Sequence, residues 1–232
     1  MDEEVVRAAA EQAEVAAVGK QAQATPWGDE AYRIDDLAAL ESLYAKAAGA
    51  SLSKEVAYLH PVYQRFVEAA PFAVLATAGP GGLDASPRGD APGFVQVLDA
   101  HTLLLPDRRG NNRLDSLRNI LADPRVALLF MVPGVRETLR VNGRARISTD
   151  PALLQRCEMG GQLPRTALLI DIETVFFQCS RALVRSRLWD ADAQVPRDAL
   201  PSAGQVLAAL SEGFDGVAYD VELPARVQRS LY

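Results

Sequence analysis

Residues 103–118 read LLLPDRRGNNRLDSLR, a hydrophobic run that breaks at a basic turn rich in Gly and Asn and then resumes with helical spacing. A strand that ends in such a turn directs backbone N–H groups and guanidinium groups towards one point, which is the arrangement that a phosphate needs. The stretch therefore predicts an anion-binding turn between a strand and a helix.

The charge composition indicates that the positive charge of this turn serves a local binding site and is not part of a broad basic surface. The chain has 30 Asp and Glu against 24 Lys and Arg, a net charge of -6, so it lacks the broad positive field typical of nucleic-acid binding. The lysines are Lys20, Lys46 and Lys54, and every later basic residue is an arginine, apart from two histidines. Arginine holds planar oxyanions through two hydrogen bonds and stays protonated. We expect small anions as ligands and no nucleic acid.

The sequence contains few of the residues that other classes of site require. No apolar run is long enough to span a membrane, and residues 1–4 are acidic where a signal peptide carries basic residues, so we expect a cytoplasmic protein without membrane contact. Cys157 and Cys179 are too few for a disulfide framework. His60 precedes a proline and His101 lies in an expected hairpin turn, so both are interpreted as turn residues. We predict no metal site.

Apolar periodicity and turn residues predict a mainly β protein. A helix over residues 1–24 receives no functional assignment. The predicted strands are residues 72–77, 83–89, 94–98, 102–105, 125–132, 138–148 and 166–178. The predicted helices are residues 37–44 after an Asp35-Asp36 cap, 59–67, 114–121, 152–158 after an Asp150-Pro151 cap, 179–187 and 206–210. Short antiparallel strands with inserted helices favour a closed or partly closed barrel, and an open α+β sheet is the alternative.

Two separate segments are expected to meet at the turn. Hairpin-ordered strands would bring Ser86 and Arg88 beside Asn112 and Arg113, so that all four converge on one phosphate. Each charge-assisted hydrogen bond of this kind contributes about 1.5–3 kcal/mol, so three of them make an effective site. The alternative is that the arginines are solvated and paired with nearby carboxylates. Those carboxylates are Asp90, Asp107 and Asp115.

An ordered set of motifs carries a family resemblance. The set is Ser-Pro-Arg-Gly-Asp at residues 86–90, Leu-Pro-Asp at 105–107, Arg-Gly-Asn-Asn-Arg at 109–113, LRVNGRA at 139–145 and CSRALVRSRLW at 179–189. Together they resemble the pyridoxamine 5′-phosphate oxidase-like FMN-binding split-barrel family over roughly residues 60–190. True pyridoxamine 5′-phosphate oxidases end in an Arg-x-His type of segment. This chain has no histidine after His101, so the resemblance does not extend to the vitamin B6 substrate.

The resemblance implies a six-stranded antiparallel split β-barrel with peripheral helices, which forms a homodimer with FMN between the subunits. It implies three regions: an N-terminal helical extension at residues 1–58, the FMN-binding split-barrel domain at 59–190, and a helical tail at 191–232 that packs on the barrel. The implied cofactor contacts are Ser86, Arg88 and Gly89 along the flavin and its phosphate, Arg109, Asn112 and Arg113 on the phosphate, Thr138 and Arg140 on the ring or ribityl chain, and Arg185 and Trp189 from the other subunit. Trp189 also fits a role as a core or interface aromatic residue.

The expected function follows from the cofactor. The flavin supplies the redox chemistry, so the protein needs to orient it and no catalytic side chain is assigned. A guanidinium such as that of Arg140 or Arg185 would stabilise the reduced, anionic flavin. We therefore expect an FMN-dependent oxidoreductase that acts on a small molecule. The alternative is a carrier or sensor of flavin, deazaflavin or haem on the same fold.

Overall fold

The computed structural model describes residues 32–231, and its contacts divide the chain into residues 1–47 and 48–232. The predicted helix at residues 1–24 lies outside the described residues. In the first unit, α2 (Leu37–Ser42) begins as predicted at Asp36, whose carboxylate accepts a hydrogen bond from the N–H of Ala39 at 2.8 Å. No residue of α2 is buried.

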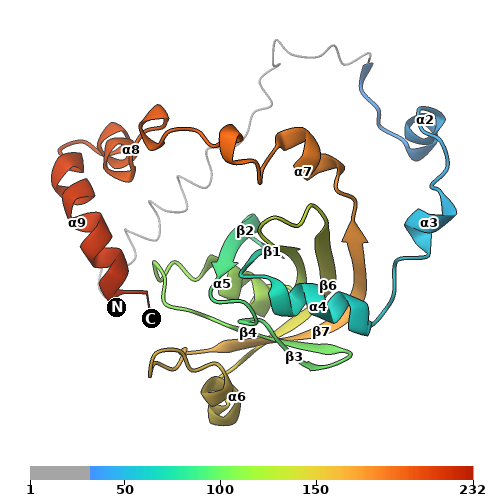
Figure 1. Ribbon diagram of the computed structural model, residues 1–232, viewed down its shortest axis with the longest axis horizontal. Coiled ribbons are helices and arrows are strands. Elements are labelled where there is room, and N and C mark those ends of the chain that lie inside the picture. Colours follow the sequence, from blue (N-terminus) through green and yellow to red (C-terminus); the bar gives the residue numbers. More distant parts are fainter. Residues whose placement is uncertain (1–31, 232) are drawn as a thin grey trace. The chain divides into compact units, whose positions relative to one another are not determined.

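The second unit is built on one antiparallel sheet of seven strands, in the order β2-β1-β5-β6-β7-β4-β3 (Figure 1). The strands are β1 (Phe72–Gly79), β2 (Gly82–Gly89), β3 (Gln96–Asp99), β4 (Thr102–Pro106), β5 (Arg125–Met131), β6 (Thr138–Ser148) and β7 (Ala167–Gln178). Every segment that alternation predicted as a strand forms one. The mainly β antiparallel architecture with helices is therefore confirmed.

The expectation of six strands closed into a barrel is wrong. The seventh strand is β3, which forms its own hairpin with β4, and within residues 32–231 the edge strands β2 and β3 form no ladder with each other. The predicted closure fails because, among the described residues, β2 forms a ladder with β1 alone and β3 with β4 alone, so each keeps one edge without a strand partner. The sheet is therefore open between β2 and β3.

The hydrophobic core is formed by every second residue of the strands, because successive side chains face opposite sides of the sheet. On β1 and β5 the inward residues include Leu75, Leu128 and Phe130, each at most 1% exposed, while their sequence neighbours face outward. The register shifts between Asn142 and Gly143, where β6 bulges against β7. A Cβ at Gly143 would lie 2.2 Å from the carbonyl oxygen of Asp171, so only glycine fits this close approach of two strands.

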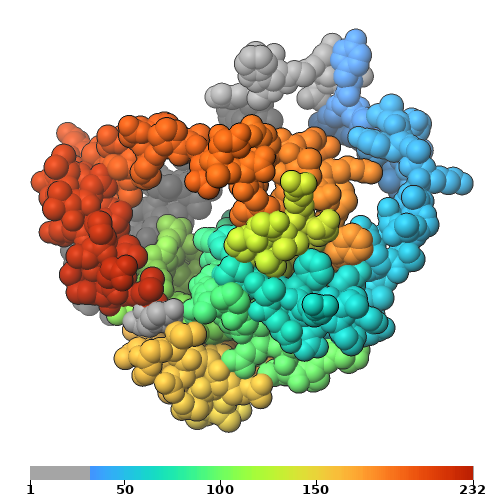
Figure 2. Space-filling view, in the orientation of Figure 1, coloured from blue at the N-terminus to red at the C-terminus, as the bar shows by residue number. Residues whose placement is uncertain are grey.

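Helical segments precede, interrupt and follow the strands along the chain. They are α3 (Gly49–Leu52), α4 (Pro61–Ala69), α5 (Asp115–Ala122), α6 (Pro151–Arg156), α7 (Arg181–Ser186), the 3-10 turns η2 (Ala191–Ala193) and η3 (Arg197–Ala199), α8 (Ala203–Leu210) and α9 (Gly216–Arg229). His60 caps α4 by accepting the N–H of Val62 at Nδ1, as expected of a turn residue. Helix α4 packs on β3, and together they form one continuous surface (Figure 2).

The C-terminal segment contains a helix that the sequence pattern missed. Helix α9 carries Pro224 in its interior, and this residue interrupts the pattern by which helices are recognised. Helices α8 and α9 pack closely at Gly204, where a Cβ would lie 2.0 Å from the carbonyl oxygen of Gly216. Asp220 accepts hydrogen bonds from the N–H of Gly204 and the hydroxyl of Ser202. Among the described residues, no helix has the length and apolar character needed to cross a membrane.

Candidate anion-binding site

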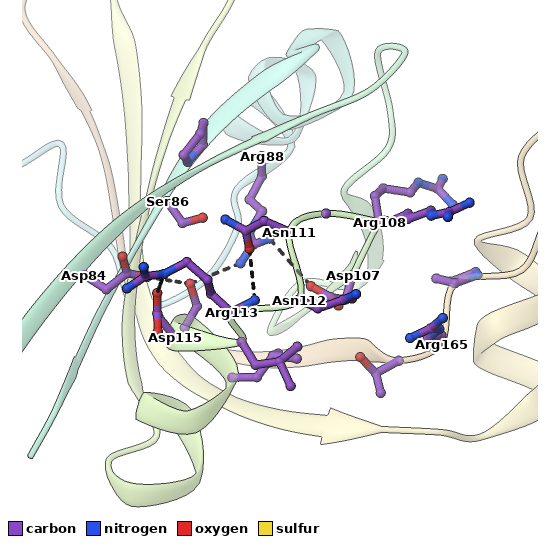
Figure 3. A pocket seen from close by; sticks show the side chains of 18 of the residues that line it. Asp84, Ser86, Arg88, Asp107, Arg108, Asn111, Asn112, Arg113, Asp115 and Arg165 are labelled. Carbon is purple, nitrogen blue, oxygen red and sulfur yellow. Dashed lines mark hydrogen bonds and ion pairs between the residues drawn. The ribbon is translucent and has the colours of Figure 1, made fainter. Parts of the chain in front are cut away.

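A pocket of about 720 Å³ lies where three segments of the second unit meet (Figure 3). Its walls are residues 84–88 of β2, residues 107–117 from the end of β4 into α5, and residues 162–166 before β7. The pairing of Pro106 with Ala167 brings the last segment beside the turn, and the N–H of Asp107 donates to the carbonyl of Thr166 at 3.0 Å. The pocket therefore depends on a long-range strand pair.

Strand β2 supplies polar side chains because of its alternation. Asp84, Ser86 and Arg88 are paired with inward-facing residues of β1, so they share the inner face of the sheet. Because β2 is an edge strand, its inner face borders the pocket, and these side chains line it. Ser86 and Arg88 consequently point towards the turn, as Figure 3 shows.

The turn after β4 holds an unfavourable backbone conformation. Asn112 and Leu114 have φ values of 59° and 62°, in the left-handed region. Asparagine tolerates this region, whereas a left-handed leucine costs about 1–2 kcal/mol. The side chain of Asn111 accepts the N–H of Arg113 at 3.0 Å and fixes the turn. The N-cap residue of α5 is Leu114, which makes no side-chain cap hydrogen bond, so the first N–H groups of the helix are available to an anion at the pocket.

Three arginines of the site are paired with carboxylates, as the alternative interpretation of the sequence stated. Arg113 Nε lies 2.8 Å from Asp115, on the exposed side of the turn. Arg88 lies 3.5 Å from Asp107 and donates to the hydroxyl of Ser116 at 3.1 Å. That hydroxyl donates in turn to Asp84 at 2.6 Å. The bonds of Ser116 to Arg88 and Asp84 hold β2 against the start of α5, whereas the Arg113–Asp115 pair joins the turn to its own helix.

The third pair differs from the others by its burial. Arg108 Nε lies 2.7 Å from the carboxylate of Asp90, whose side chain is 1% exposed. Arg108 also donates to the carbonyl of Cys157 at 2.6 Å. Arg108 therefore connects the turn to the segments after β2 and α6, and its guanidinium stabilises the fold.

Ionisation is perturbed at two groups that line the pocket. Burial raises the pKa of the Asp107 carboxyl, and the nearby Arg88 charge partly opposes this rise. The hydrogen bond and the charge of Asp115 raise the pKa of Arg113, which therefore stays protonated. Burial therefore makes the charged form of Asp107 costly in this pocket.

Cations outnumber carboxylates in the pocket. Its lining contains five arginines and three aspartates. Within residues 32–231, neither Arg109 nor Arg165 has a carboxylate partner or a side-chain hydrogen bond. The hydroxyl oxygen of Thr166 is buried and has no hydrogen-bond partner, which is a costly arrangement for a polar group. The pocket thus offers an oxyanion two arginines, Arg109 and Arg165, that no carboxylate of the described residues neutralises.

The predicted site residues fall into two groups. The structure brings Ser86, Arg88, Arg109, Asn112 and Arg113 around the pocket. It places Gly89 on a neighbouring hollow of about 420 Å³, which also includes residues at the end of α9.

The other four predicted residues lie outside the lining of this pocket. Thr138 is buried at the start of β6, and Arg185 is exposed on α7. The Arg140 guanidinium lies 4.2 Å from the ring centre of Phe176, and its Nε is buried without a partner. Trp189 donates its indole N–H to the carbonyl of Val135 at 2.7 Å. These residues are therefore not brought together with the turn within one subunit.

Sequence reasoning missed Arg165 and Thr166. The signal was an arginine directly before a predicted strand, and nothing local shows that this strand pairs with β4.

The family model described as pyridoxamine 5′-phosphate oxidase matches residues 59–179, more than half of the chain. The chain belongs to the pyridoxamine 5′-phosphate oxidase family. The matched region contains the whole sheet and every residue that lines the pocket of 720 Å³. No curated protein matches the chain significantly.

Several solved structures are similar to this member of the pyridoxamine 5′-phosphate oxidase family over about half its length. Tagged HupZ of Group A Streptococcus is 17% identical, with a TM-score of 0.41 over 49% of this chain and 88% of that chain. General stress protein 26 of Bacillus anthracis strain Sterne is 14% identical, with a TM-score of 0.38 over 49% and 88%. An FMN-binding protein of Syntrophomonas wolfei is 10% identical, with a TM-score of 0.38 over 50% and 88%.

Proposed function

We propose that the protein binds FMN, with the phosphate of the cofactor held by the turn between β4 and α5, and that it acts as an FMN-dependent oxidoreductase on a small molecule. Residues 59–190 form the flavin-binding domain in this proposal, and residues 1–58 and 191–232 are extensions. The observation that carries the proposal is the turn itself. Its unpaired Arg109 and left-handed Asn112 stand before an uncapped helix N-terminus in a pocket with surplus cations.

The residues present fit a phosphate. Arg109 has no carboxylate to give up, and the Arg113–Asp115 pair is exposed, so exchanging Asp115 for a phosphate costs little. Ser86 adds a hydroxyl donor from β2. The pocket volume of about 720 Å³ is within the usual range of roughly 300–1,000 Å³ for cofactor and ligand sites.

A second copy of the chain would complete the site in this proposal. The outer faces of β1 and β5 carry apolar side chains, although an outer face in contact with water is normally polar. Phe72 on β1 is exposed, and the others are only partly buried: Val74 and Ala76 on β1, and Ala127, Leu129 and Met131 on β5. Arg140 lies on the same outward side of β6, beside Leu129. This apolar face supports a homodimer in which Arg140 faces the partner.

The division of roles follows from the chemistry of the group. A bound flavin supplies the hydride and electron chemistry, whereas the side chains of this chain bind and orient it. Arg140 has a buried Nε without a partner, so it has a donor available for an acceptor atom near the outer face. Phe176 holds the Arg140 guanidinium in place through a contact of 4.2 Å with its ring.

The experiment is a titration of full-length protein with FMN, followed by visible absorbance and flavin fluorescence. We expect saturable FMN binding, and Arg113→Glu should weaken it by at least about tenfold because a donor becomes a repelling carboxylate. The control is Arg125→Glu, since Arg125 also pairs with an aspartate two residues away but lies outside the pocket. Colourless protein that takes up no FMN would overturn the proposal.

Two further measurements test the oxidoreductase and the dimer separately. Anaerobic addition of reduced nicotinamide dinucleotide or another donor should give saturable flavin reduction, whereas a carrier or sensor shows none. Leu129→Glu places a charge on the apolar outer face and should convert dimers to monomers in analytical ultracentrifugation. Wild-type protein that is monomeric at all concentrations would contradict the dimer.

A further inference from the structure

The geometry points to Lys54 as a residue that favours the reduced state of the bound flavin, because its amine adds a second positive charge beside that of Arg140. This inference rests on the proposed function, in which FMN lies between two subunits and Arg140 faces the partner. It gives a role to the segment before residue 59, which lies outside the family match.

Lys54 and Arg140 approach the same aromatic ring. The Arg140 guanidinium lies 4.2 Å from the ring centre of Phe176, and the Lys54 amine lies 5.8 Å from that centre. The first contact follows from the register, because Arg140 and Phe176 are opposite each other on β6 and β7. The amine also lies 4.6 Å from the ring centre of Phe177. Aromatic faces attract cations, so these two rings gather two positive charges beside β7.

The backbone around Lys54 is fixed to the sheet and to α4. The hydroxyl of Tyr63 on α4 donates to the carbonyl of Lys54 at 2.7 Å. Two residues later, Val56 and Val175 of β7 exchange backbone hydrogen bonds of 3.0 and 2.8 Å. The Lys54 side chain is partly buried. Its amine is therefore held near β7 by local bonds and by the aromatic rings.

The two charges are not neutralised within residues 32–231. Neither Lys54 nor Arg140 forms an ion pair there, and Glu137, three residues before Arg140, pairs with neither. The next outward arginines of β6 each face an acidic residue of β7, in the pairs Arg144 with Glu173 and Arg146 with Asp171. Like charges near one ring repel each other, so a neighbouring group that gains negative charge is stabilised.

The flavin ring is a group of this kind. The oxidised ring is neutral, and uptake of a hydride from a reduced nicotinamide adds one negative charge to the ring and leaves an oxidised nicotinamide. Charges close to the ring tune its electronic properties. Lys54 and Arg140 together therefore favour reduced over oxidised FMN, and Lys54 contributes its share through space.

The experiment is an anaerobic redox titration of full-length protein loaded with FMN, with a reference dye. Lys54→Met should lower the preference for reduced over oxidised FMN by about tenfold, which lowers the midpoint potential by about 30 mV for a two-electron couple. Lys54→Arg keeps the charge and should keep most of the wild-type potential. The matched control is Arg146→Met, because Arg146 is also outward on β6 but is paired with Asp171.

Two further readouts separate charge from structure. Added salt should reduce the difference between wild type and Lys54→Met, since the amine is partly exposed and its field is screened. The affinity for oxidised FMN should change by less than about twofold, because the oxidised ring carries no charge. Thermal denaturation checks that each variant is folded.

The outcomes distinguish this inference from the proposed function. Protein that takes up no FMN overturns both. If FMN binds and Lys54→Met shifts the potential no more than Arg146→Met does, the role of Lys54 is wrong and FMN binding stands. Equal shifts for Lys54→Arg and Lys54→Met would also refute that role, because the effect would not follow the charge.

Discussion

Replacing Arg108 with methionine is expected to destabilise the fold without removing a ligand contact. The substitution keeps most of the side-chain volume but removes the ion pair with Asp90, whose carboxylate is 1% exposed. It also removes the donor to the carbonyl of Cys157. The Asp90 carboxylate keeps the hydrogen bond from the N–H of Ala91 but loses its ion pair with Arg108, and a buried carboxylate that loses its counter-ion is costly.

The expected magnitude comes from that burial. Breaking a buried ion pair on one side costs about 3–5 kcal/mol of unfolding free energy. For a chain of this size, 1 kcal/mol lowers the melting temperature by about 2–4 °C, so the loss is roughly 6–20 °C. Urea denaturation followed by circular dichroism gives the free energy, and thermal denaturation gives the temperature shift.

The same turn provides the control. Arg113→Met removes an arginine whose ion pair with Asp115 is exposed, so the melting temperature should stay close to that of the wild type. Asp90→Asn combined with Arg108→Met should recover part of the loss, because no buried charge remains. A loss below about 1 kcal/mol for Arg108→Met, or equal effects at Arg108 and Arg113, would refute the reasoning.

Three other predictions concern stability, pH and the pocket. Gly143→Ala should cost about 1–3 kcal/mol in urea denaturation, because the new Cβ meets a backbone oxygen at 2.2 Å, whereas Gly81→Ala meets nothing and should be neutral. Hydrogen bonds from a neighbouring guanidinium lower the pKa of Asp123 from 3.8 to about 2, so this carboxylate stabilises the fold above about pH 4 and the contribution is lost as the pH falls towards 2. The stability difference between wild type and Asp123→Asn should therefore shrink over that range, and a constant difference would contradict the assignment. Asp107→Asn removes a negative charge and frees Arg88, so calorimetry should show tighter FMN binding, and weaker binding would count against a phosphate in this pocket.

The strands could be predicted from the sequence because their patterns are local. The alternation of residues 138–148 and the apolar run of residues 125–132 identify β6 and β5 directly. The order of strands depends on contacts between distant segments, such as Pro106 with Ala167, which no local pattern records. The resemblance implied six strands, whereas the residues themselves indicated seven, and the structure has seven.

The sequence likewise predicted the local part of the site, which is the turn, and missed the residues that distant segments bring to it. The turn could be identified from Arg109, Asn112 and Arg113, because basic residues and turn-forming residues are visible in a linear sequence. Arg165 could not be recognised as a site residue, because its place in the pocket depends on contacts between distant segments and on which carboxylates lie near it in space. The burial that separates Arg108 from Arg113 is likewise invisible, although both follow the same strand.

Strand β2 forms a wall of the pocket and is also an edge of the sheet, so within residues 32–231 β1 alone holds it by a ladder. Pro87 lies in this strand and has no N–H to offer another chain, which protects the free edge from strand addition. The outward amides of β2 should exchange with solvent deuterium faster than those of β5, which has a neighbour on each side. An anion bound in the pocket should therefore slow the exchange of these β2 amides and leave the exchange of the β5 amides unchanged.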